Sequence, residues 1–517
     1  MNLQGQTGIM NTTTPYWIET AQLPHFETLT QDLHVDVAII GGGITGITAA
    51  YLLKQAGKTV ALLEKGSCAD IYTGHTTAHL TCVSDIFLTD LVKNFGQDHA
   101  QAVWDAGFAA IDQIENLVTS ERIDCEFSRV PGYLHAQLQG GTADERPDFK
   151  AQAAQAEKLG FEASYTDRIP FFGLPGTMFP NQAKFHPRKY VKALLEKIPG
   201  RGSYIFEHTM AEEVVEKPLG IKVGEYTVNC DYVIVATHVP LMGKTNLVSA
   251  TLLQTKIFPY TSYALGAHVP KGTIPEALYW DTSDPYHYLR VDPKPDYDYI
   301  IFGGSDHKTG QAEDTEAQYN KLEKLLKKVI PMAQLSHRWS GQVIETMDGL
   351  PYIGETSKKQ FVGTGFSGNG MTFGTLTAMM AYDKIMGRKN PWKELFHPDR
   401  KKIKGGAWDY LRENKDYPYY LVKTRLQSAE GTKVETLKPG EGRILELDGK
   451  KVAVSRAVGG DLHYCSAVCT HMGCLVEWNN AEKSWDCPCH GSRFAASGEL
   501  IAGPAETALE SVQPKSK

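Results

Sequence analysis

Val35-Asp-Val-Ala-Ile-Ile40 runs directly into Gly41-Gly-Gly-Ile-Thr-Gly46, and this stretch decides the fold of the first part of the chain. The apolar run is typical of a strand buried on both faces of a parallel sheet. The glycine-rich turn leads into residues 47–55, whose pattern predicts an amphipathic helix. Strand, glycine turn and helix follow one another in the order that a dinucleotide-binding unit requires.

The glycines of this turn each have a predicted role. Gly41 would make the tight turn, Gly43 would let the backbone approach a pyrophosphate, and Gly46 would let the helix pack on the strand. The phosphates would lie at the helix N-terminus. A second predicted strand ends at Glu64, where an acidic partner for a ribose hydroxyl belongs, and its charge argues against NADP. A glycine turn without a cofactor is the alternative, and the choice between NAD and FAD stays open at this point.

Two distant segments are predicted to extend the same sheet. Residues 230–238 form a buried strand pattern that ends in the small-residue turn Ala236-Thr237. Residues 360–371 place another glycine-rich turn after a strand and before a helix predicted over 371–386, whose N-terminus can hold negative charge. The sheet is therefore assembled from segments far apart in the chain.

Composition excludes several classes of protein. Of the 517 residues, 42% are hydrophobic and 22% are charged, which is near the average of globular proteins. The net charge of −7 supplies no basic field, so nucleic acid is not an expected partner. The start of the chain has no signal-peptide pattern, and glycines interrupt the most apolar stretch. We expect a cytoplasmic protein without an integral membrane anchor.

The first part of the chain, over about residues 30–390, resembles the D-amino-acid oxidase and glycine oxidase family of FAD-dependent oxidoreductases. The motifs that carry the resemblance are the N-terminal glycine turn, Glu64, the Ala236-Thr237 turn, Asp348-Gly-Leu-Pro-Tyr-Ile-Gly354 and Gly363-Thr-Gly-Phe-Ser-Gly-Asn-Gly-Met371. The resemblance implies FAD rather than NAD. It also implies that the last motif lies beside the flavin, with Gly365, Gly368, Gly370 and Met371 close to the ring.

A second sheet is predicted over residues 128–165 and 254–337, where aromatic and β-branched residues alternate. In the family that the chain resembles, an antiparallel sheet covers the flavin and commonly offers a tyrosine and a carboxylate-binding arginine to the substrate. This implies Arg290 as the carboxylate-binding residue, with Tyr288 and His287 as weaker candidates. A salt bridge or a solvated strand end is the equally weighted alternative for Arg290.

The loop Thr73-Gly-His-Thr-Thr-Ala-His79 follows Glu64, where the family leads the chain past the flavin. Its His75 and Thr76 are expected beside the cofactor. Some relatives attach FAD to a histidine in this region, but the spacing here favours loop histidines with backbone partners. The expectation is FAD held without a covalent bond.

Near the C-terminus, five of the nine cysteines lie within 25 residues, and four of them stand in two boxes, Cys469-Thr-His-Met-Gly-Cys474 and Cys487-Pro-Cys-His-Gly-Ser492. Each box supplies one thiolate and one imidazole, which is what a Rieske [2Fe–2S] centre needs. A structural Cys₂His₂ zinc site is the competing interpretation, but it leaves Cys474 and Cys489 without a part.

The two boxes resemble those of cytochrome bc-type Rieske proteins. The resemblance implies Cys469, His471, Cys487 and His490 as iron ligands and a disulfide between Cys474 and Cys489. Ser492 stands where that family donates a hydrogen bond to cluster sulfur, whereas Phe494 replaces a tyrosine that donates another. We therefore expect a lower potential than in respiratory Rieske proteins.

The predicted fold class is α/β plus all-β, with three parts in one chain. Residues 30–395 form the oxidoreductase, a Rossmann-like FAD-binding domain (about 30–125, 179–245 and 339–395) with an antiparallel substrate domain (about 126–178 and 246–338). A linker helix over 396–427 leads to a small all-β Rieske domain over 428–517.

A two-electron flavin and a one-electron cluster in one chain predict a dehydrogenase that passes electrons on singly. The expected substrate is a small amine or amino acid, and the external acceptor is unknown. An O₂-using oxidase with a structural Rieske domain, and a redox sensor that turns over little, are the alternatives. A ring-hydroxylating oxygenase fits less well, because no ligand set for a mononuclear iron is recognisable.

Overall fold

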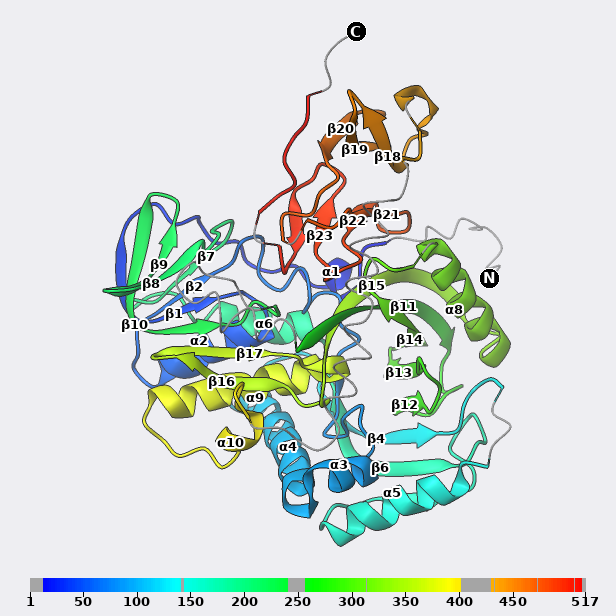
Figure 1. Cartoon of the computed structure of the whole chain (residues 1–517). Coiled ribbons are helices and arrows are strands. Elements are labelled where there is room, and N and C mark those ends of the chain that lie inside the picture. Colours follow the sequence, from blue (N-terminus) through cyan, green and yellow to red (C-terminus); the bar gives the residue numbers. More distant parts are fainter. Residues whose placement is uncertain are drawn as a thin grey trace.

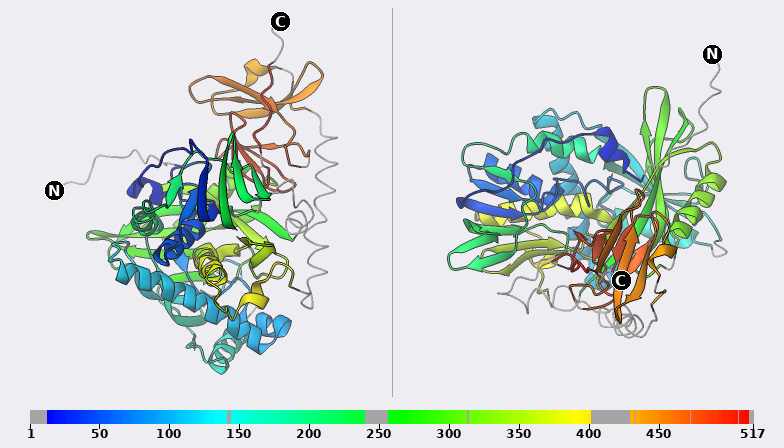
Figure 2. Two further views of the ribbon diagram at one scale, coloured as in Figure 1. Left: turned by 90° about the vertical axis from the view of Figure 1, so that its left-hand side faces the viewer. Right: turned by 90° about the horizontal axis from the view of Figure 1, so that it is seen from above.

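A computed structural model describes residues 13–140, 144–239, 256–312, 314–400, 429–431, 433–471, 473–505 and 507–513. Two large sheets with their helices form the body of the molecule, and the small C-terminal β-domain lies on top of both (Figure 1). The two further views place this domain on the same side of the body (Figure 2). The predicted fold class is confirmed.

The first sheet has eight strands in the order β16-β17-β10-β1-β2-β7, with the hairpin β8-β9 attached to β10. Its centre is parallel, because β1 pairs in parallel with β2 and β10, and β10 with β17. The strands are β1 (Leu33–Ile40), β2 (Val60–Leu63), β7 (Tyr204–Phe206), β8 (Glu213–Glu216), β9 (Leu219–Val223), β10 (Tyr226–Val235), β16 (Tyr352–Ser357) and β17 (Gln360–Thr364).

Helices cover this sheet as the glycine turns predict. Helix α2 (Ile44–Gln55) follows β1, and α9 (Gly370–Ile385) follows β17. Both are buried along most of their length, and they pack against each other and against α4 (Gln97–Ser120) and α6 (Pro187–Leu195). Buried residues of β1, β2, α2 and α9 share the largest hydrophobic core of the chain. The predicted sheet assembled from distant segments is confirmed.

The second sheet has nine strands in the order β15-β11-β14-β13-β12-β4-β6-β3, with β5 paired to β6. All of its pairs are antiparallel except β12 with β4. Helix α8 (Thr315–Val329) packs on β11 and β14, and α5 (Arg146–Lys158) packs on β6. The strands are β3 (His79–Leu80), β4 (Ser128–His135), β5 (Ser164–Thr166), β6 (Gly176–Lys184), β11 (Ile257–Pro270), β12 (Leu278–Asp281), β13 (Tyr288–Pro293), β14 (Tyr297–Lys308) and β15 (Gln334–Thr346).

Two predicted domain boundaries fall inside strands of this sheet. Strand β6 continues past residue 178 and β15 continues past residue 338, and both belong to the second sheet over their whole length. The sheet therefore extends beyond the expected limits of the substrate domain, because strand pairing rather than local composition determines where it ends.

The C-terminal domain is all-β and antiparallel. It contains a three-stranded sheet, β18 (Gly442–Leu447), β19 (Lys450–Arg456) and β20 (Leu462–Ser466). A four-stranded sheet follows, made of β21 (Glu477–Asn479), β22 (Ser484–Asp486), β23 (Arg493–Ala495) and β24 (Leu500–Ala502). Most of the predicted linker helix over 396–427 lies outside the described residues. No described helix has the length and apolarity needed to cross a membrane.

Candidate functional site

A cavity of about 400 Å³ is lined by both large sheets and by the C-terminal domain. The first sheet contributes the turns that follow β1, β2 and β10, and the N-terminus of α9. The second sheet contributes residues of β11, β13, β14 and β15. The C-terminal domain contributes Leu500, Gly503, Pro504 and Ala505. A wall drawn from three parts of the chain can enclose a large ligand.

The glycine turn after β1 has the geometry that its sequence predicts. Gly41 has a φ of +106°, and a Cβ there would lie 2.5 Å from the Ala236 carbonyl oxygen. A Cβ on Gly46 would lie 2.0 Å from the Gly41 carbonyl oxygen. Gly41 and Gly43 line the cavity, whereas Gly46 acts by letting α2 approach the strand. Side chains at Gly41 or Gly46 are therefore excluded by the backbone itself.

Glu64 lies at the end of β2 and lines the cavity. Its carboxylate accepts hydrogen bonds from the Gly42 N–H at 2.7 Å and the Gly66 N–H at 2.9 Å. Burial raises the pKa of Glu64, and the two N–H donors oppose that rise. Ala236 and Thr237, at the end of β10, line the same part of the cavity. A ribose contact of Glu64 stays a prediction.

The loop after β2 passes along the cavity as expected. His75 and Thr76 both line it. His75 Nδ1 lies 2.5 Å from the Ile71 carbonyl oxygen, and the Thr76 carbonyl oxygen accepts a hydrogen bond from the Trp17 indole at 2.6 Å. Burial lowers the pKa of His75. His75 therefore has the backbone partners that the spacing of the loop favours. The mode of FAD attachment stays a prediction.

The last glycine-rich segment, residues 363–371, forms another part of the cavity wall. Gly368, Gly370 and Met371 line the cavity, but Gly365 does not; its Cβ would lie 2.2 Å from Thr346 Cγ2. A Cβ on Gly370, at the start of α9, would meet no atom within 4 Å. The space at this helix N-terminus is therefore open to a ligand, and together with the turn after β1 it fits a dinucleotide whose flavin lies near α9.

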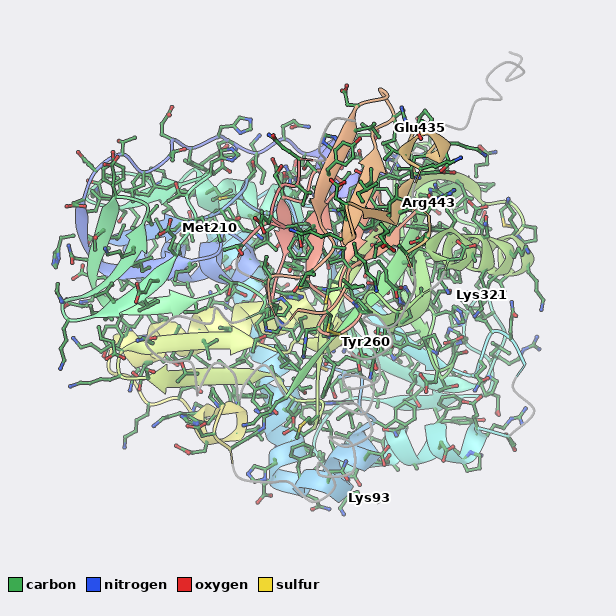
Figure 3. All side chains as sticks on the ribbon, turned by 45° about the horizontal axis from the view of Figure 1, so that its top comes forward. Lys93, Met210, Tyr260, Lys321, Glu435 and Arg443 are labelled. Atoms are coloured by element: carbon green, nitrogen blue, oxygen red, sulfur yellow. A yellow bond between two sulfur atoms is a disulfide. The ribbon has the colours of Figure 1, made fainter. Side chains whose placement is uncertain are left out.

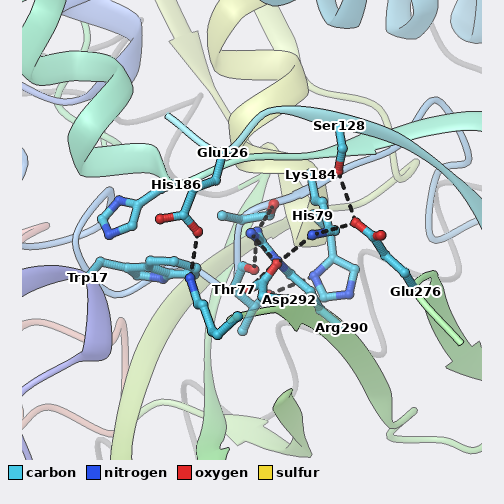
Figure 4. Close-up of polar contacts among 12 residues, drawn as sticks. Trp17, Thr77, His79, Glu126, Ser128, Lys184, His186, Glu276, Arg290 and Asp292 are labelled. Atoms are coloured by element: carbon cyan, nitrogen blue, oxygen red, sulfur yellow. Dashed lines mark hydrogen bonds and ion pairs between the residues drawn. The ribbon is translucent and has the colours of Figure 1, made fainter. Parts of the chain in front are cut away.

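Arg290 is a correction to the predicted substrate site. It is 0% exposed, does not line the cavity, and its guanidinium contacts Asp292 at 3.0 Å and the Ala78 carbonyl oxygen at 2.7 Å (Figure 4). Its charge also lies over the Trp17 ring. Burial would raise the pKa of Asp292, but Arg290 and Lys184 outweigh it and hold the pKa at about 2. This closed ion-pair network leaves no group of Arg290 for a substrate carboxylate.

The two weaker candidates for substrate residues, Tyr288 and His287, lie in different places. Tyr288 lines the cavity, and its hydroxyl lies 2.9 Å from that of Ser262. His287 does not line the cavity, and its Nδ1 lies 3.1 Å from Asp281 Oδ2. Of the three predicted substrate residues, the structure brings only Tyr288 to the cavity.

Several polar residues of the cavity wall were not predicted from the sequence, among them Asp85, Tyr286 and Asp306. One signal could have pointed to Asp306 and its neighbours: Gly303 and Gly304 end the apolar run of β14 shortly before Asp306. A Cβ on Gly303 would lie 2.2 Å from the Tyr288 ring, so this glycine marks a close approach. Asp85 stands in a loop and has no comparable signal.

The cluster boxes lie on two loops of the C-terminal domain, after β20 and after β22. Cys469 and Cys487 are buried and take no part in a disulfide, and the rings of His471 and His490 are 4.8 Å apart. The hydrogen bond that the Cys487 thiol donates to Cys469, together with burial, raises the pKa of Cys487 well above its usual value, so the two sulfur atoms lie beside each other. The predicted disulfide between Cys474 and Cys489 is confirmed. Two thiols and two imidazoles at one place fit a Rieske cluster.

The residues around the cluster loops are also buried. Ser492 accepts a hydrogen bond from the Ala505 N–H at 2.9 Å, which leaves its own O–H available as a donor. Phe494 is fully buried in β23 opposite Trp485 of β22. The hydrogen bond from Ser492 to cluster sulfur stays a prediction.

The C-terminal domain docks on β11, β14 and β15 through its cluster loops (Figure 1). Gln342 Nε2 donates to the Gly491 carbonyl oxygen at 2.9 Å, and Gln311 Nε2 to that of Pro488 at 3.1 Å. Ser340 hydrogen-bonds to Glu482, which also pairs with Arg493. A Cβ on Gly310 would lie 2.6 Å from the Cys487 carbonyl carbon.

This interface continues away from the cluster loops. Thr315 Oγ1 lies 2.8 Å from Asn479 Oδ1, and Ala481 belongs to the hydrophobic core of the second sheet. With all side chains drawn, Tyr260 lies on the body and Arg443 on the C-terminal domain, and side chains fill the zone where the two parts meet (Figure 3). The docking is therefore made of backbone, polar and apolar contacts.

Comparison with protein families gives two matches. The FAD dependent oxidoreductase family (DAO) matches residues 36–384. The Rieske [2Fe-2S] domain matches residues 430–513. The cofactors of the two domains are FAD and a [2Fe–2S] cluster, which removes the zinc alternative.

Comparison with individual proteins agrees. The Rieske 2Fe-2S iron-sulfur protein YhfW of Bacillus subtilis is 34% identical over 96% of this chain and 97% of its own. The cytochrome b6-f complex iron-sulfur subunit of Chlorobaculum thiosulfatiphilum is 41% identical over 15% of this chain and 42% of its own. The crystal structure of glycine oxidase from Geobacillus kaustophilus, 18% identical, covers 72% of this chain and 100% of its own with a TM-score of 0.57. That last likeness concerns the fold.

Proposed function

Because this chain belongs to the family of FAD-dependent oxidoreductases and ends in a Rieske [2Fe–2S] domain, we propose that it is a dehydrogenase. It oxidises a small amine or amino acid and passes the electrons singly through its cluster to an external acceptor. The flavin, when bound, accepts hydride from the carbon next to nitrogen.

One contact carries this proposal. Gln342 lines the flavin cavity and donates a hydrogen bond to the carbonyl of Gly491, the residue that directly follows the cluster ligand His490. A single side chain therefore connects the wall of one redox site to the loop of the other. Tyr72, which also lines the cavity, lies with its hydroxyl 3.5 Å from Gln342 Oε1.

The docking contacts support a cluster held in one place. Gly310 packs so closely on Cys487 that a single methyl group would not fit between them. Arg493, one residue before Phe494, is buried between Glu482 and Asp486. This network lies within the C-terminal domain, and Glu482 joins it to the body through its hydrogen bond with Ser340 of β15.

The chain's own residues have distinct tasks in this reaction. The turns at Gly41–Gly43 and Gly368–Met371 hold the two ends of the dinucleotide. The C-terminal segment Gly503–Ala505 lines the cavity, and in this reaction it would help to exclude water. Gln342 fixes the distance between cavity and cluster loop.

The test compares electron acceptors in steady state. A dehydrogenase reduces a one-electron acceptor such as ferricyanide or cytochrome c much faster than it consumes O₂. The cluster-less variant His471→Ala should still bleach its flavin with substrate but lose most of its activity with cytochrome c.

Two other results would contradict the proposal. Peroxide formed at the rate of substrate oxidation, with and without the cluster, would show an oxidase in which the Rieske domain is structural. A flavin that no member of a broad amine and amino-acid panel reduces would indicate a redox sensor.

A further inference from the structure

Two acidic side chains of the cavity wall, Asp85 in the loop after β3 and Asp306 near the end of β14, are called the acidic pair here. The carboxylate of Asp85 accepts a hydrogen bond from the Gly368 N–H at 2.9 Å. Asp306 lies at the end of β14, and its Oδ1 is buried without a hydrogen-bond partner among the described residues. Such an atom is costly unless something else satisfies it.

No described lysine or arginine forms an ion pair with either carboxylate. Among the described residues that line the cavity, the only lysine or arginine is Lys65, which follows Glu64 and donates to the Ile501 carbonyl oxygen at 2.6 Å. The three other described cavity acids have partners: Glu64 accepts from the Gly42 and Gly66 N–H groups, Asp70 pairs with Arg188 and Asp281 with His287. The acidic pair is therefore distinct from the other acids of the wall.

The surroundings of the acidic pair raise the pKa of both carboxyl groups, and a bound cation would oppose that rise. Burial raises the pKa of Asp306 to about 7; a Ser262 hydrogen bond and the charge of His287 oppose the rise, and Asp85 adds to it. Burial raises the pKa of Asp85 as well, although this side chain is open to the cavity. Two like charges in one poorly solvated space disfavour each other, and a positive ligand between them removes that cost.

Aromatic rings complete the environment. Tyr286, Tyr288 and Trp280 line the same cavity, and the first two rings have centroids 5.8 Å apart. The Tyr286 hydroxyl and the Asp85 carboxylate both lie beside Gly368, within 2.7 to 3.2 Å of the point where a Cβ would stand. Carboxylates together with aromatic faces form the environment that binds ammonium groups.

We propose that the substrate of this cavity is a cationic amine without a carboxylate, its ammonium group held by Asp85 and Asp306 among the rings of Tyr286, Tyr288 and Trp280. This inference rests on the proposed function and narrows its substrate class. An amino acid would bring a carboxylate into a wall that already carries two, and Arg290 is not available to receive it.

The pair also provides the proton acceptor that amine oxidation needs. The bound ammonium gives one N–H proton to Asp306 Oδ1, which frees the nitrogen lone pair. The C–H bond next to nitrogen then breaks, its hydride leaves for the flavin, and the lone pair forms the C=N bond of the iminium product. Charge and electrons balance without a further reactant.

The first experiment measures binding rather than turnover, on the full chain loaded with both cofactors. Tetramethylammonium, which has no nitrogen lone pair and cannot lose hydride in this way, is titrated while the flavin absorbance is followed. It should bind, acetate should not, and Asp306→Asn and Asp85→Asn should each weaken binding about tenfold or more. Asp98→Asn, a matched change on the exposed start of α4, should have no effect.

A second arm separates this inference from the proposed function. Phenethylamine should reduce the flavin under anaerobic conditions, whereas phenylalanine, which adds only a carboxylate, should not. Faster reduction by phenylalanine would overturn the cationic site and leave the dehydrogenase standing. Tetramethylammonium binding that depends on the acidic pair, without reduction by any amine, would support the site and contradict the dehydrogenase. Equal binding by wild type and both acidic variants, or no binding at all, would overturn the inference.

Discussion

The cavity proposed for FAD draws its wall from segments as far apart as Gly41 and Met371, whereas the four predicted cluster ligands lie on two loops of one small domain. The first site depends on strand order and close backbone contacts across two sheets. The second depends on two short boxes and a disulfide between them. This difference implies that the two sites can be damaged independently, and that the contacts joining them form a third, separable feature.

The largest expected effect is the loss of one cofactor without the other. Gly46→Ala places a Cβ 2.0 Å from the Gly41 carbonyl oxygen, which forces α2 away from β1. We expect the purified variant to contain almost no FAD but a full Rieske EPR signal. Gly459→Ala, where a Cβ would meet no atom within 4 Å and φ is not positive, is the control for adding a methyl group to a glycine. A flavin content equal to that of wild type would refute the packing argument.

The next effect concerns the ion-pair network of Arg290, the residue that the sequence suggests as a substrate-binding group. Arg290→Met leaves Asp292 buried with only Lys184 as its cationic partner, which should lower the free energy of unfolding by about 3–5 kcal/mol. Thermal unfolding followed by flavin release measures this change. Arg168 is exposed and lies between β5 and β6, so Arg168→Met should change the free energy of unfolding by less than about 1 kcal/mol. Unchanged stability with weaker binding of amino acids would restore Arg290 as a substrate residue.

A smaller effect is expected on the connection between the two sites. Gln342→Leu leaves the Gly491 carbonyl without its donor, a loss of about 1–3 kcal/mol at the interface. In stopped-flow experiments flavin reduction should keep its rate, while cluster reduction should slow several-fold. Gln97→Leu, on the exposed start of α4, is the matched control. Equal slowing of both phases would place the role of Gln342 in flavin binding instead.

The smallest effect is a change in potential at the cluster alone. Phe494→Tyr adds a hydroxyl in β23 close to the cluster loops, and a new hydrogen bond to sulfur should raise the midpoint potential by roughly a few tens of millivolts. Protein-film voltammetry measures it. Phe206→Tyr, in β7 of the first sheet, should leave the potential unchanged. A lower midpoint in Phe494→Tyr would contradict the predicted direction.

How much could be predicted from the sequence follows from the same comparison. Cys469, His471, Cys487 and His490 are separated by few residues, so short-range spacing specifies their chemistry. The turn at Gly41–Gly46 is also local, and its strand, turn and helix are confirmed. These are the parts whose geometry one loop or one βα unit determines.

The substrate wall could not be predicted, because partners decide the role of each charge there. Arg290 and Asp306 are both polar residues on strands of the second sheet. Arg290 meets Asp292 and two carbonyl oxygens, whereas Asp306 Oδ1 meets no partner among the described residues. Only the pairing of distant segments decides that Arg290 lies in a satisfied ion-pair network while Asp306 faces the cavity.

The central claim is that electrons from one substrate reach both redox groups of the same chain. Anaerobic titration with phenethylamine, followed by flavin absorbance and Rieske EPR together, tests it most directly. A flavin that takes two electrons and a cluster that takes one require about one and a half equivalents of substrate for full reduction. His471→Ala should need about one. A flavin that is fully reduced while the cluster stays oxidised would contradict the account.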